Sequence, residues 1–217
     1  LCYNYIMFVI PNQNIETENC DISHQMLFQT PLFEIVVKDI DNKELAENVY
    51  KLKEIDNDGC KKSNNGGWHS TEFGMRVEKD QDNLQFFTPL LDKFEYILPI
   101  LPFEPTIVSL ENYGIWANIN TKNSFNTRHN HPGCDLAGVY YVKVPEGDVG
   151  NIVFNDPRQV LSYGDQFITQ RYVGGESTSR FPVEGNMYLF PPSLEHCVMP
   201  NKTDEDRISI SFNLNLR

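Results

Sequence analysis

The C-terminal segment has the most regular pattern of apolar and polar residues in the chain. From Arg207 to Leu214 the two kinds alternate without interruption: Ile208, Ile210, Phe212 and Leu214 are apolar, and Arg207, Ser209, Ser211 and Asn213 are polar. Successive side chains of a strand point to opposite faces of the sheet. The pattern therefore predicts a strand whose apolar face lies in a core. Its polar face either meets solvent or lines a cavity that holds a polar ligand.

Further strand-like segments lie in the second half of the chain. They are rich in β-branched and aromatic residues and are bounded by turn-forming residues. We predict strands at 106–120, 136–144, 150–154, 167–173, 186–190, 194–199 and 206–215.

Two amphipathic helices are predicted in the first half. From Asp41 to Ile55, apolar residues recur at helical spacing, at Leu45, Val49, Leu52 and Ile55. Asp41 and Glu44 stand in positions like those of a capping box, in which side chains satisfy the free amides at the start of a helix.

The second helix is predicted to open at Thr88-Pro89. Thr88 can cap it, and Pro89 suits a first turn, where a missing amide hydrogen does no harm. The buried stripe of this helix would comprise Leu90, Leu91, Phe94, Ile97 and Leu98. No repeats or linkers interrupt the chain, so we expect one α+β domain, mainly β, with a single core.

Three of the five histidines have a spacing typical of a metal site. His129 and His131 would project from the same face of a strand, and His196 can supply a third ligand from a distant strand. Three protein ligands leave positions open for substrate and dioxygen, as in non-haem iron centres. A structural zinc site would have four ligands, usually several of them cysteines. The alternative is that His129 and His131 are polar loop residues before the turn at Pro132-Gly133.

The polar face of the C-terminal strand suits an organic acid. An arginine guanidinium makes short bidentate bonds to a carboxylate, and a nearby hydroxyl adds another donor. Arg207 and Ser209 share that face. Together with the histidines, they indicate a metal with an organic-acid co-substrate beside it.

The net charge and the cysteine content limit the partners and the cellular location that we expect. The net charge of −12 argues against duplex nucleic acid or an anionic membrane as a main partner. The five cysteines are odd in number and form no motif, which is typical of reduced thiols in an intracellular protein. We therefore expect a cytoplasmic location.

The chain resembles the 2-oxoglutarate/Fe(II)-dependent oxygenases, and the segment 185–198 followed by Arg207-x-Ser209 is similar to their distal half. More closely, it is similar to a subfamily of 2OG-Fe(II) oxygenases met in phage and marine bacterial genomes. The matching segments are Asn64–Ser70, Trp116–Asn120, His129–Gly133, Gly138–Val142, Asp156–Arg158 and Arg207–Asn213. The resemblance covers roughly residues 26–217.

The resemblance implies a double-stranded β-helix, also called a jelly roll or cupin-like fold, with the N-terminal helices packed outside. We expect a single domain at 26–217, with a helical part at about 26–105 and a jelly-roll core at about 106–217. The location would be the cytoplasm of a bacterial or phage-infected host cell. Residues 1–25 are expected to be a non-native or disordered extension before Met26. Their apolar start, residues 1–10, is too short to span a bilayer and lacks the basic flank of a signal peptide.

The resemblance also implies a ligand set, with one departure. The superfamily triad is H-x-D/E…H, so His129 matches its first ligand and His196 its last, while His131 occupies the carboxylate position. We favour a three-histidine iron centre. Two alternatives stay open: Asp135 supplies the carboxylate, or His131 faces substrate and only two residues bind metal. A neutral third ligand makes the site one charge more positive, which should tighten binding of a dianionic co-substrate.

The resemblance implies roles for several cavity residues. Arg207 and Ser209 match the residues that hold the distal carboxylate of 2-oxoglutarate. Tyr141 lies in a strand where the superfamily often places a carboxylate-binding tyrosine. Asn118 and Asn120 resemble polar residues that line the co-substrate pocket, although capping of a strand end is the alternative.

The implied activity is that of an Fe(II)- and 2-oxoglutarate-dependent dioxygenase. It would use O2 to hydroxylate an unknown small molecule or protein side chain, with decarboxylation of 2-oxoglutarate to succinate. One rival is a cupin-like three-histidine metalloenzyme without a keto acid, which would not need Arg207 and Ser209 as a carboxylate clamp. The other is a non-catalytic jelly-roll interaction module, against which retention of the histidines and the arginine argues.

Overall fold

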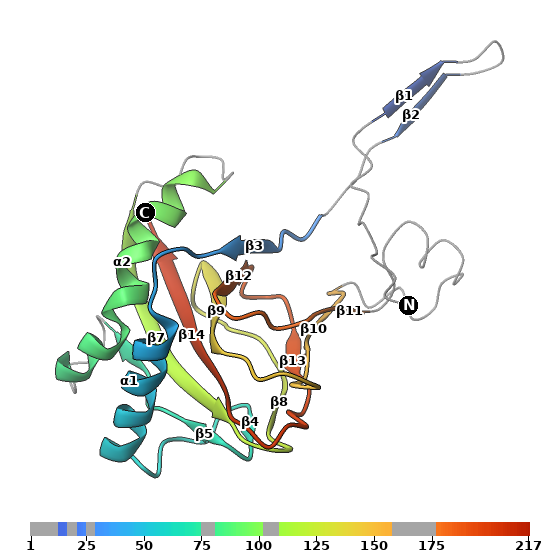
Figure 1. Cartoon of the computed structure of the whole chain (residues 1–217). Coiled ribbons are helices and arrows are strands. Elements are labelled where there is room, and N and C mark those ends of the chain that lie inside the picture. The colour runs from blue at the N-terminus through green and yellow to red at the C-terminus, as the bar shows by residue number, and fades with distance from the viewer. Residues whose placement is uncertain (1–12, 17–20, 25–28, 75–80, 102–108, 158–176) are drawn as a thin grey trace. The chain divides into compact units, whose positions relative to one another are not determined.

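The computed structural model describes residues 13–16, 21–24, 29–74, 81–101, 109–157 and 177–217 (Figure 1). The chain divides into two compact units, Leu1–Pro31 and Leu32–Arg217. The first unit contains an antiparallel pair, β1 (Gln13–Glu16) and β2 (Asp21–His24). The expectation that residues 1–25 are foreign to the native protein stays a prediction.

The second unit contains two sheets, in which every pairing between described strands is antiparallel. The seven-stranded sheet has the order β3 (Phe33–Val36), β12 (Asn186–Phe190), β9 (Leu136–Lys143), β14 (Arg207–Leu216), β7 (Leu110–Asn120) and β5 (Trp68–His69), with β6 (Phe73–Gly74) also on β7. The five-stranded sheet has the order β11 (Ser177–Arg180), β10 (Ile152–Asn155), β13 (His196–Val198), β8 (Phe125–His129) and β4 (Asn64–Asn65).

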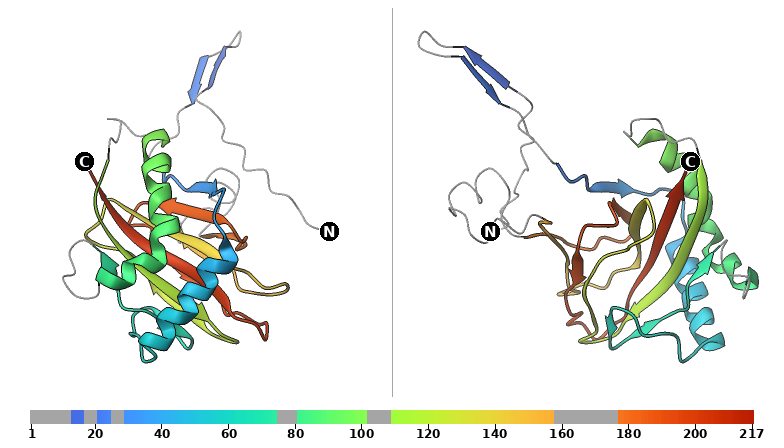
Figure 2. Two further views of the ribbon diagram at one scale, coloured as in Figure 1. Left: turned by 60° about the vertical axis from the view of Figure 1, so that its left-hand side comes forward. Right: turned by 180° about the vertical axis from the view of Figure 1, so that it is seen from behind.

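Two helices cover the outer face of the seven-stranded sheet (Figure 2). They are α1 (Asn42–Ile55) and α2 (Thr88–Ile97), and the 3-10 helices η1 (Gln81–Phe87) and η2 (Leu98–Ile100) flank α2. Their buried residues join the outward residues of β7 and β14 in one core, for example Phe94 against Phe212. The predicted mainly β domain with helices packed outside is therefore confirmed.

The helix starts differ in how they are capped. Asp41 precedes α1, and its carboxylate accepts hydrogen bonds from the amides of Lys43 and Glu44, both at 3.0 Å. At α2 the predicted cap was wrong. Phe87, not Thr88, is the capping residue, without a side-chain bond, because η1 runs directly into the helix. Pro89 lies in the first turn, as predicted.

The longer predicted strands are present with small shifts at their ends, as β7, β9, β10, β12, β13 and β14. The predicted strand 167–173, and residues 106–108 of another, lie outside the described residues. Sequence patterns missed β1, β2, β3, β4, β5, β6, β8 and β11. Each of these is only two to five residues long, too short to show a clear alternation.

The alternating residues of β14 form one apolar face and one polar face, as predicted. Ile208, Ile210 and Phe212 are fully buried in the core beneath the helices. The polar residues of the opposite face line a cavity. Within the part of the chain that the structure describes, no helix has the length and apolar character needed to cross a membrane.

Candidate metal centre and co-substrate pocket

A cavity of about 530 Å³ is lined by strands of both sheets. The inward faces of β7, β9 and β14 form one wall, and residues of β8, β10 and β13 form the other. The cavity brings together eight of the residues predicted from the sequence: His129, His131, His196, Arg207, Ser209, Tyr141, Asn118 and Asn120.

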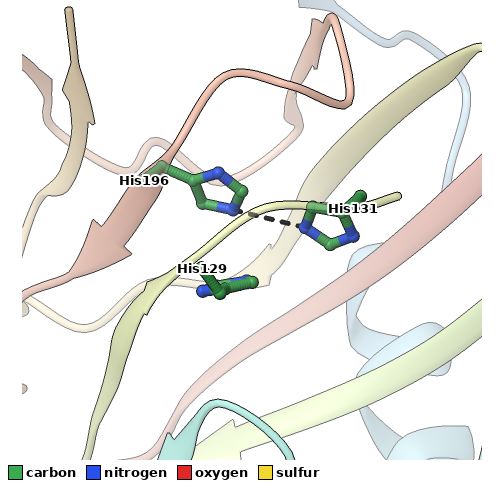
Figure 3. A group of neighbouring side chains, drawn as sticks. All are labelled: His129, His131 and His196. Atoms are coloured by element: carbon green, nitrogen blue, oxygen red, sulfur yellow. Dashed lines mark hydrogen bonds between the residues drawn. The ribbon is translucent and has the colours of Figure 1, made fainter. Parts of the chain in front are cut away.

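Three histidines form a cluster in this cavity (Figure 3). One ring nitrogen from each lies within 4.8 Å of the others, and the Nε2 atoms of His131 and His196 are 3.4 Å apart. His129 ends β8 and is directly opposite His196, which begins β13. The strand pairing therefore places two of the rings together.

His131 was predicted to join the cluster from the same strand as His129, and this prediction was wrong. β8 ends at His129, so His131 does not share a strand with it. Instead, the amide of His131 donates a hydrogen bond to the carbonyl of Pro192 at 2.9 Å, which ties this segment to the loop before His196.

Backbone carbonyls orient two of the rings. The Nδ1 atom of His129 is 2.7 Å from the carbonyl oxygen of Thr127, and that of His196 is 3.0 Å from the carbonyl oxygen of Leu194. A carbonyl can only accept, so Nδ1 carries the hydrogen in each ring and Nε2 keeps a free lone pair. This is the arrangement in which a histidine can bind a metal through Nε2.

Burial keeps the cluster neutral. It lowers the pKa of His131 to about 4 and that of His196 to about 3, with a further lowering from the neighbouring His129 in each case. Burial also lowers the pKa of His129. The imidazoles are therefore unprotonated at neutral pH, as metal binding requires.

The metal-free protein should lose stability as the pH falls below about 6.5. An unfolded chain protonates His131 and His196 near that pH, whereas the folded chain does so only near pH 4 and pH 3. The unfolded state therefore takes up more protons in this window, so the free energy of unfolding decreases as the pH is lowered. We expect a loss on the order of 2 kcal/mol per buried histidine between pH 7 and pH 5.

Urea denaturation in the presence of a chelator, repeated across this pH range, measures the effect. The His196→Gln variant should lose less stability than the wild type over the same range. Equal losses in the two proteins would contradict the explanation.

The alternative ligand lies outside the cluster. Asp135 is exposed, and its carboxylate accepts a hydrogen bond from the amide of Leu216 at 2.8 Å. Its own amide donates to the carbonyl of Leu214. The C-terminal end of β14 thus holds Asp135, and the structure brings His131 rather than Asp135 to the other two histidines.

The same cavity contains an arginine that has no anionic partner among the described residues. Arg207 is 1% exposed, and its Nη1 atom donates to the carbonyls of Val149 and Gly150 at 2.6 and 2.8 Å. Its Nε is buried and has no hydrogen-bond partner in the part of the chain that the structure describes. Burial lowers its pKa, and no ion pair among the described residues involves it. A buried cation without a counter-ion is costly, so the site is suited to receive an anion.

Strand register places polar side chains around this arginine. Asn120 of β7 is opposite Arg207, and Ser209 is flanked by Asn118 of β7 and Tyr141 of β9. Burial raises the pKa of Tyr141 to about 12, so its hydroxyl stays protonated and can donate.

The two asparagines bond within the cavity wall. The amide nitrogen of Asn118 donates to Ser211 at 3.1 Å, while its buried Oδ1 has no partner. The amide nitrogen of Asn120 donates to Asn126 at 3.4 Å. Both side chains therefore bond to other side chains of the wall.

Sequence reasoning missed an aromatic stack beside the histidines. The ring of Trp116 lies between those of His69 and His131, with both centroid distances at 5.9 Å. The signal was available, because Trp116 is two residues before Asn118 and so shares its inward face. The contact with His69 depends on the pairing of β5 with β7, which the sequence pattern did not predict.

A family model matches the part of the chain that carries this site. Residues 114–213 match the model described as "Putative 2OG-Fe(II) oxygenase". The matched segment includes all three histidines of the cluster, together with Arg207 and Ser209. No curated protein matches the chain.

Solved structures share the fold at low sequence identity. A prolyl-4-hydroxylase from Pseudomonas putida is 12% identical, with 86% of this chain and 92% of that chain covered, and a TM-score of 0.54. A prolyl hydroxylase from Trichoplax adhaerens, in complex with a hypoxia inducible factor peptide fragment, is 11% identical, with 85% and 83% covered and a TM-score of 0.51. A viral collagen prolyl hydroxylase from Paramecium Bursaria Chlorella virus-1, in a 2OG complex, is 14% identical, with 84% and 94% covered and a TM-score of 0.50. The predicted double-stranded β-helix is confirmed.

Proposed function

We propose that this protein, whose residues 114–213 form a 2OG-Fe(II) oxygenase domain, hydroxylates its substrate through a three-histidine iron centre. The 2OG-Fe(II) oxygenases are oxidoreductases, and their cofactors are Fe(II), 2-oxoglutarate and O2. The finer elements of the proposal are the ligand set, the residues that hold the keto acid, and the reaction.

The observation that carries the proposal is the buried guanidinium of Arg207 in the cavity of the three histidines, which forms no ion pair with any described residue. A metal chelate of 2-oxoglutarate would leave the far carboxylate free to meet such a group. Arg207 and Ser209 would donate hydrogen bonds to it, and the protonated hydroxyl of Tyr141 would add a third donor.

The residues of the chain would orient and enclose the reactants. His129, His131 and His196 would hold the metal through Nε2, and Arg207 would fix the direction in which the keto acid lies. When bound, the iron, 2-oxoglutarate and O2 would supply the oxidising power, with 2-oxoglutarate decarboxylated to succinate. The aromatic walls at Trp116 and Phe190 would keep water from the reacting atoms.

The substitution of a histidine for the usual carboxylate supports the same assignment. Three neutral imidazoles would leave the full charge of a bound Fe(II) uncompensated by its protein ligands. A dianionic co-substrate is therefore attracted both by the metal and by Arg207.

The substrate is proposed to be a peptide side chain or a small molecule. The similar structure from T. adhaerens contains a bound peptide fragment, which supports the first possibility. The net charge of −12 disfavours duplex nucleic acid.

Anaerobic titration tests the co-substrate assignment directly. Adding Fe(II) and then 2-oxoglutarate should produce the visible metal-to-ligand charge-transfer band of a chelated keto acid. Succinate, which has no keto group, is the matched control and should give no band. Stoichiometric iron binding without the band would refute the co-substrate assignment and favour a cupin-like three-histidine enzyme.

A further inference from the structure

Glu72 is the one carboxylate among the described residues that line the cavity. It belongs to the segment between β5 and β6, and both of these strands pair with β7. Within this segment, the amide of Ser70 donates to the carbonyl of Ala117 at 3.0 Å, and the amide of Ala117 donates to the Ser70 hydroxyl at 3.0 Å. The backbone that carries Glu72 is therefore tied to β7 on both sides of this residue.

The side chain of Glu72 lies over Gly114 of β7. A Cβ atom added at Gly114 would overlap the Oε1 atom of Glu72, so the absence of a side chain at this position leaves room for the carboxylate. Gly114 is two residues before Trp116, which lines the cavity, and so shares its inward face. The carboxylate therefore lies on the cavity side of β7.

The pairing of β7 with β14 gives the order of the groups along this wall. Arg207 is opposite Asn120, and six positions of β7, or about 20 Å, separate Asn120 from Gly114. Trp116 lies between them, and its ring stacks on that of His131 at a centroid distance of 5.9 Å. The wall therefore has a cation at one end and a carboxylate at the other, with the histidine cluster beside its middle.

No described residue neutralises the charge of Glu72. Lys62 also lines the cavity, but no ion pair among the described residues involves either side chain. Both are exposed, so they lie where the cavity opens to solvent. Glu72 is also not a member of the cluster of possible metal ligands. A ligand that enters the cavity can therefore meet this carboxylate without displacing a metal or breaking an ion pair.

We propose that Glu72 binds a positively charged group of the substrate, an ammonium or a guanidinium, at the end of the cavity opposite Arg207. The carboxylate would accept charge-assisted hydrogen bonds from that group. The substrate would then reach the histidine cluster from the side opposite to the keto acid. The net charge of −12 would favour the approach of a cation. This inference names a substrate class for the proposed function and rests on that function.

Binding of matched probes tests the proposal. The amides of Nα-acetyl-arginine and Nα-acetyl-lysine carry the two cations, and the corresponding citrulline and norleucine compounds are their neutral counterparts. Each probe is titrated by calorimetry into the anaerobic complex of the protein with Fe(II) and 2-oxoglutarate. At least one cationic probe should bind about 10-fold or more tightly than its neutral counterpart, as expected for hydrogen bonds to a charged group.

Three variants locate the source of this preference. Glu72→Gln keeps the size of the side chain and removes its charge, so it should abolish the preference. Gly114→Ala should reduce it, because the added methyl group displaces the carboxylate. The matched control is Glu111→Gln, which removes an exposed carboxylate from β7 outside the cavity and should keep the preference. Urea denaturation of every variant checks that each is folded.

The outcomes separate this inference from the proposed function. A wild type that binds no cationic probe more tightly than its neutral counterpart, or a full preference in Glu72→Gln or Gly114→Ala, would overturn the cation subsite. Equal losses in Glu72→Gln and Glu111→Gln would overturn it as well, since net charge alone would then explain the preference. Failure of the wild type to form the charge-transfer band with 2-oxoglutarate would instead overturn the proposed function. The same titrations of the metal-free protein would still test the subsite.

Discussion

Replacing His131 by alanine should abolish tight iron binding, whereas Asp135→Ala should leave it intact. His131 places a ring nitrogen within 4.8 Å of those of His129 and His196, while the Asp135 carboxylate bonds to the amide of Leu216. Removing a direct ligand should cost more than the ~100-fold that loss of a residue behind a ligand can cause.

Anaerobic equilibrium dialysis with Fe(II) measures both variants against the wild type. Asp135→Ala serves as the control, since it also truncates a polar side chain near the end of β14. The opposite result, with iron lost only in Asp135→Ala, would make Asp135 the carboxylate ligand. His131 would then be a substrate-facing residue.

Arg207 variants should lose 2-oxoglutarate and keep iron. Arg207→Lys retains the charge but loses the planar fork, and should weaken keto-acid binding by roughly 1–3 kcal/mol. Arg207→Ala should weaken it further, because the charge is lost as well. Iron affinity should hardly change, since the three histidines of the cluster lie on β8 and β13 and in the segment after β8.

Stability must be measured beside affinity, because Arg207 also donates to the carbonyls of Val149 and Gly150. Ile208→Ser is the control for a purely structural loss. Ile208 is fully buried on the opposite face of β14, so this variant should lower stability by roughly a few kcal/mol and spare keto-acid affinity. Arg207 variants that melt early but bind 2-oxoglutarate normally would show that Arg207 only braces the loop at 149–150.

The spacing of apolar residues was enough to predict the long strands and helices that bury one face in the core. The alternation of β14 separated its core residues from its cavity residues, since burial and strand period are directly linked. His129 and His131 meet as predicted, but not through the strand period, because His131 lies beyond the end of β8.

What the sequence could not predict depends on contacts between distant segments. β8 has no apolar alternation and exists because β13 and β4 pair with it. The position of His131 follows from a bond to the loop at Pro192, and the partners of Arg207 come from the loop after β9. Such contacts produce no repeating pattern of residues in the sequence.

The attachment of Arg207 would also limit which acids the cavity accepts in the proposed function. Two backbone carbonyls hold the guanidinium from behind, and the side chain begins on a central strand of the seven-stranded sheet. The distance from the guanidinium to the histidine cluster is therefore set by rigid backbone. In the proposed roles of Arg207 and the three histidines, a keto acid would have to match this distance in order to meet both of its ends. Selection among keto acids would thus be made by chain length.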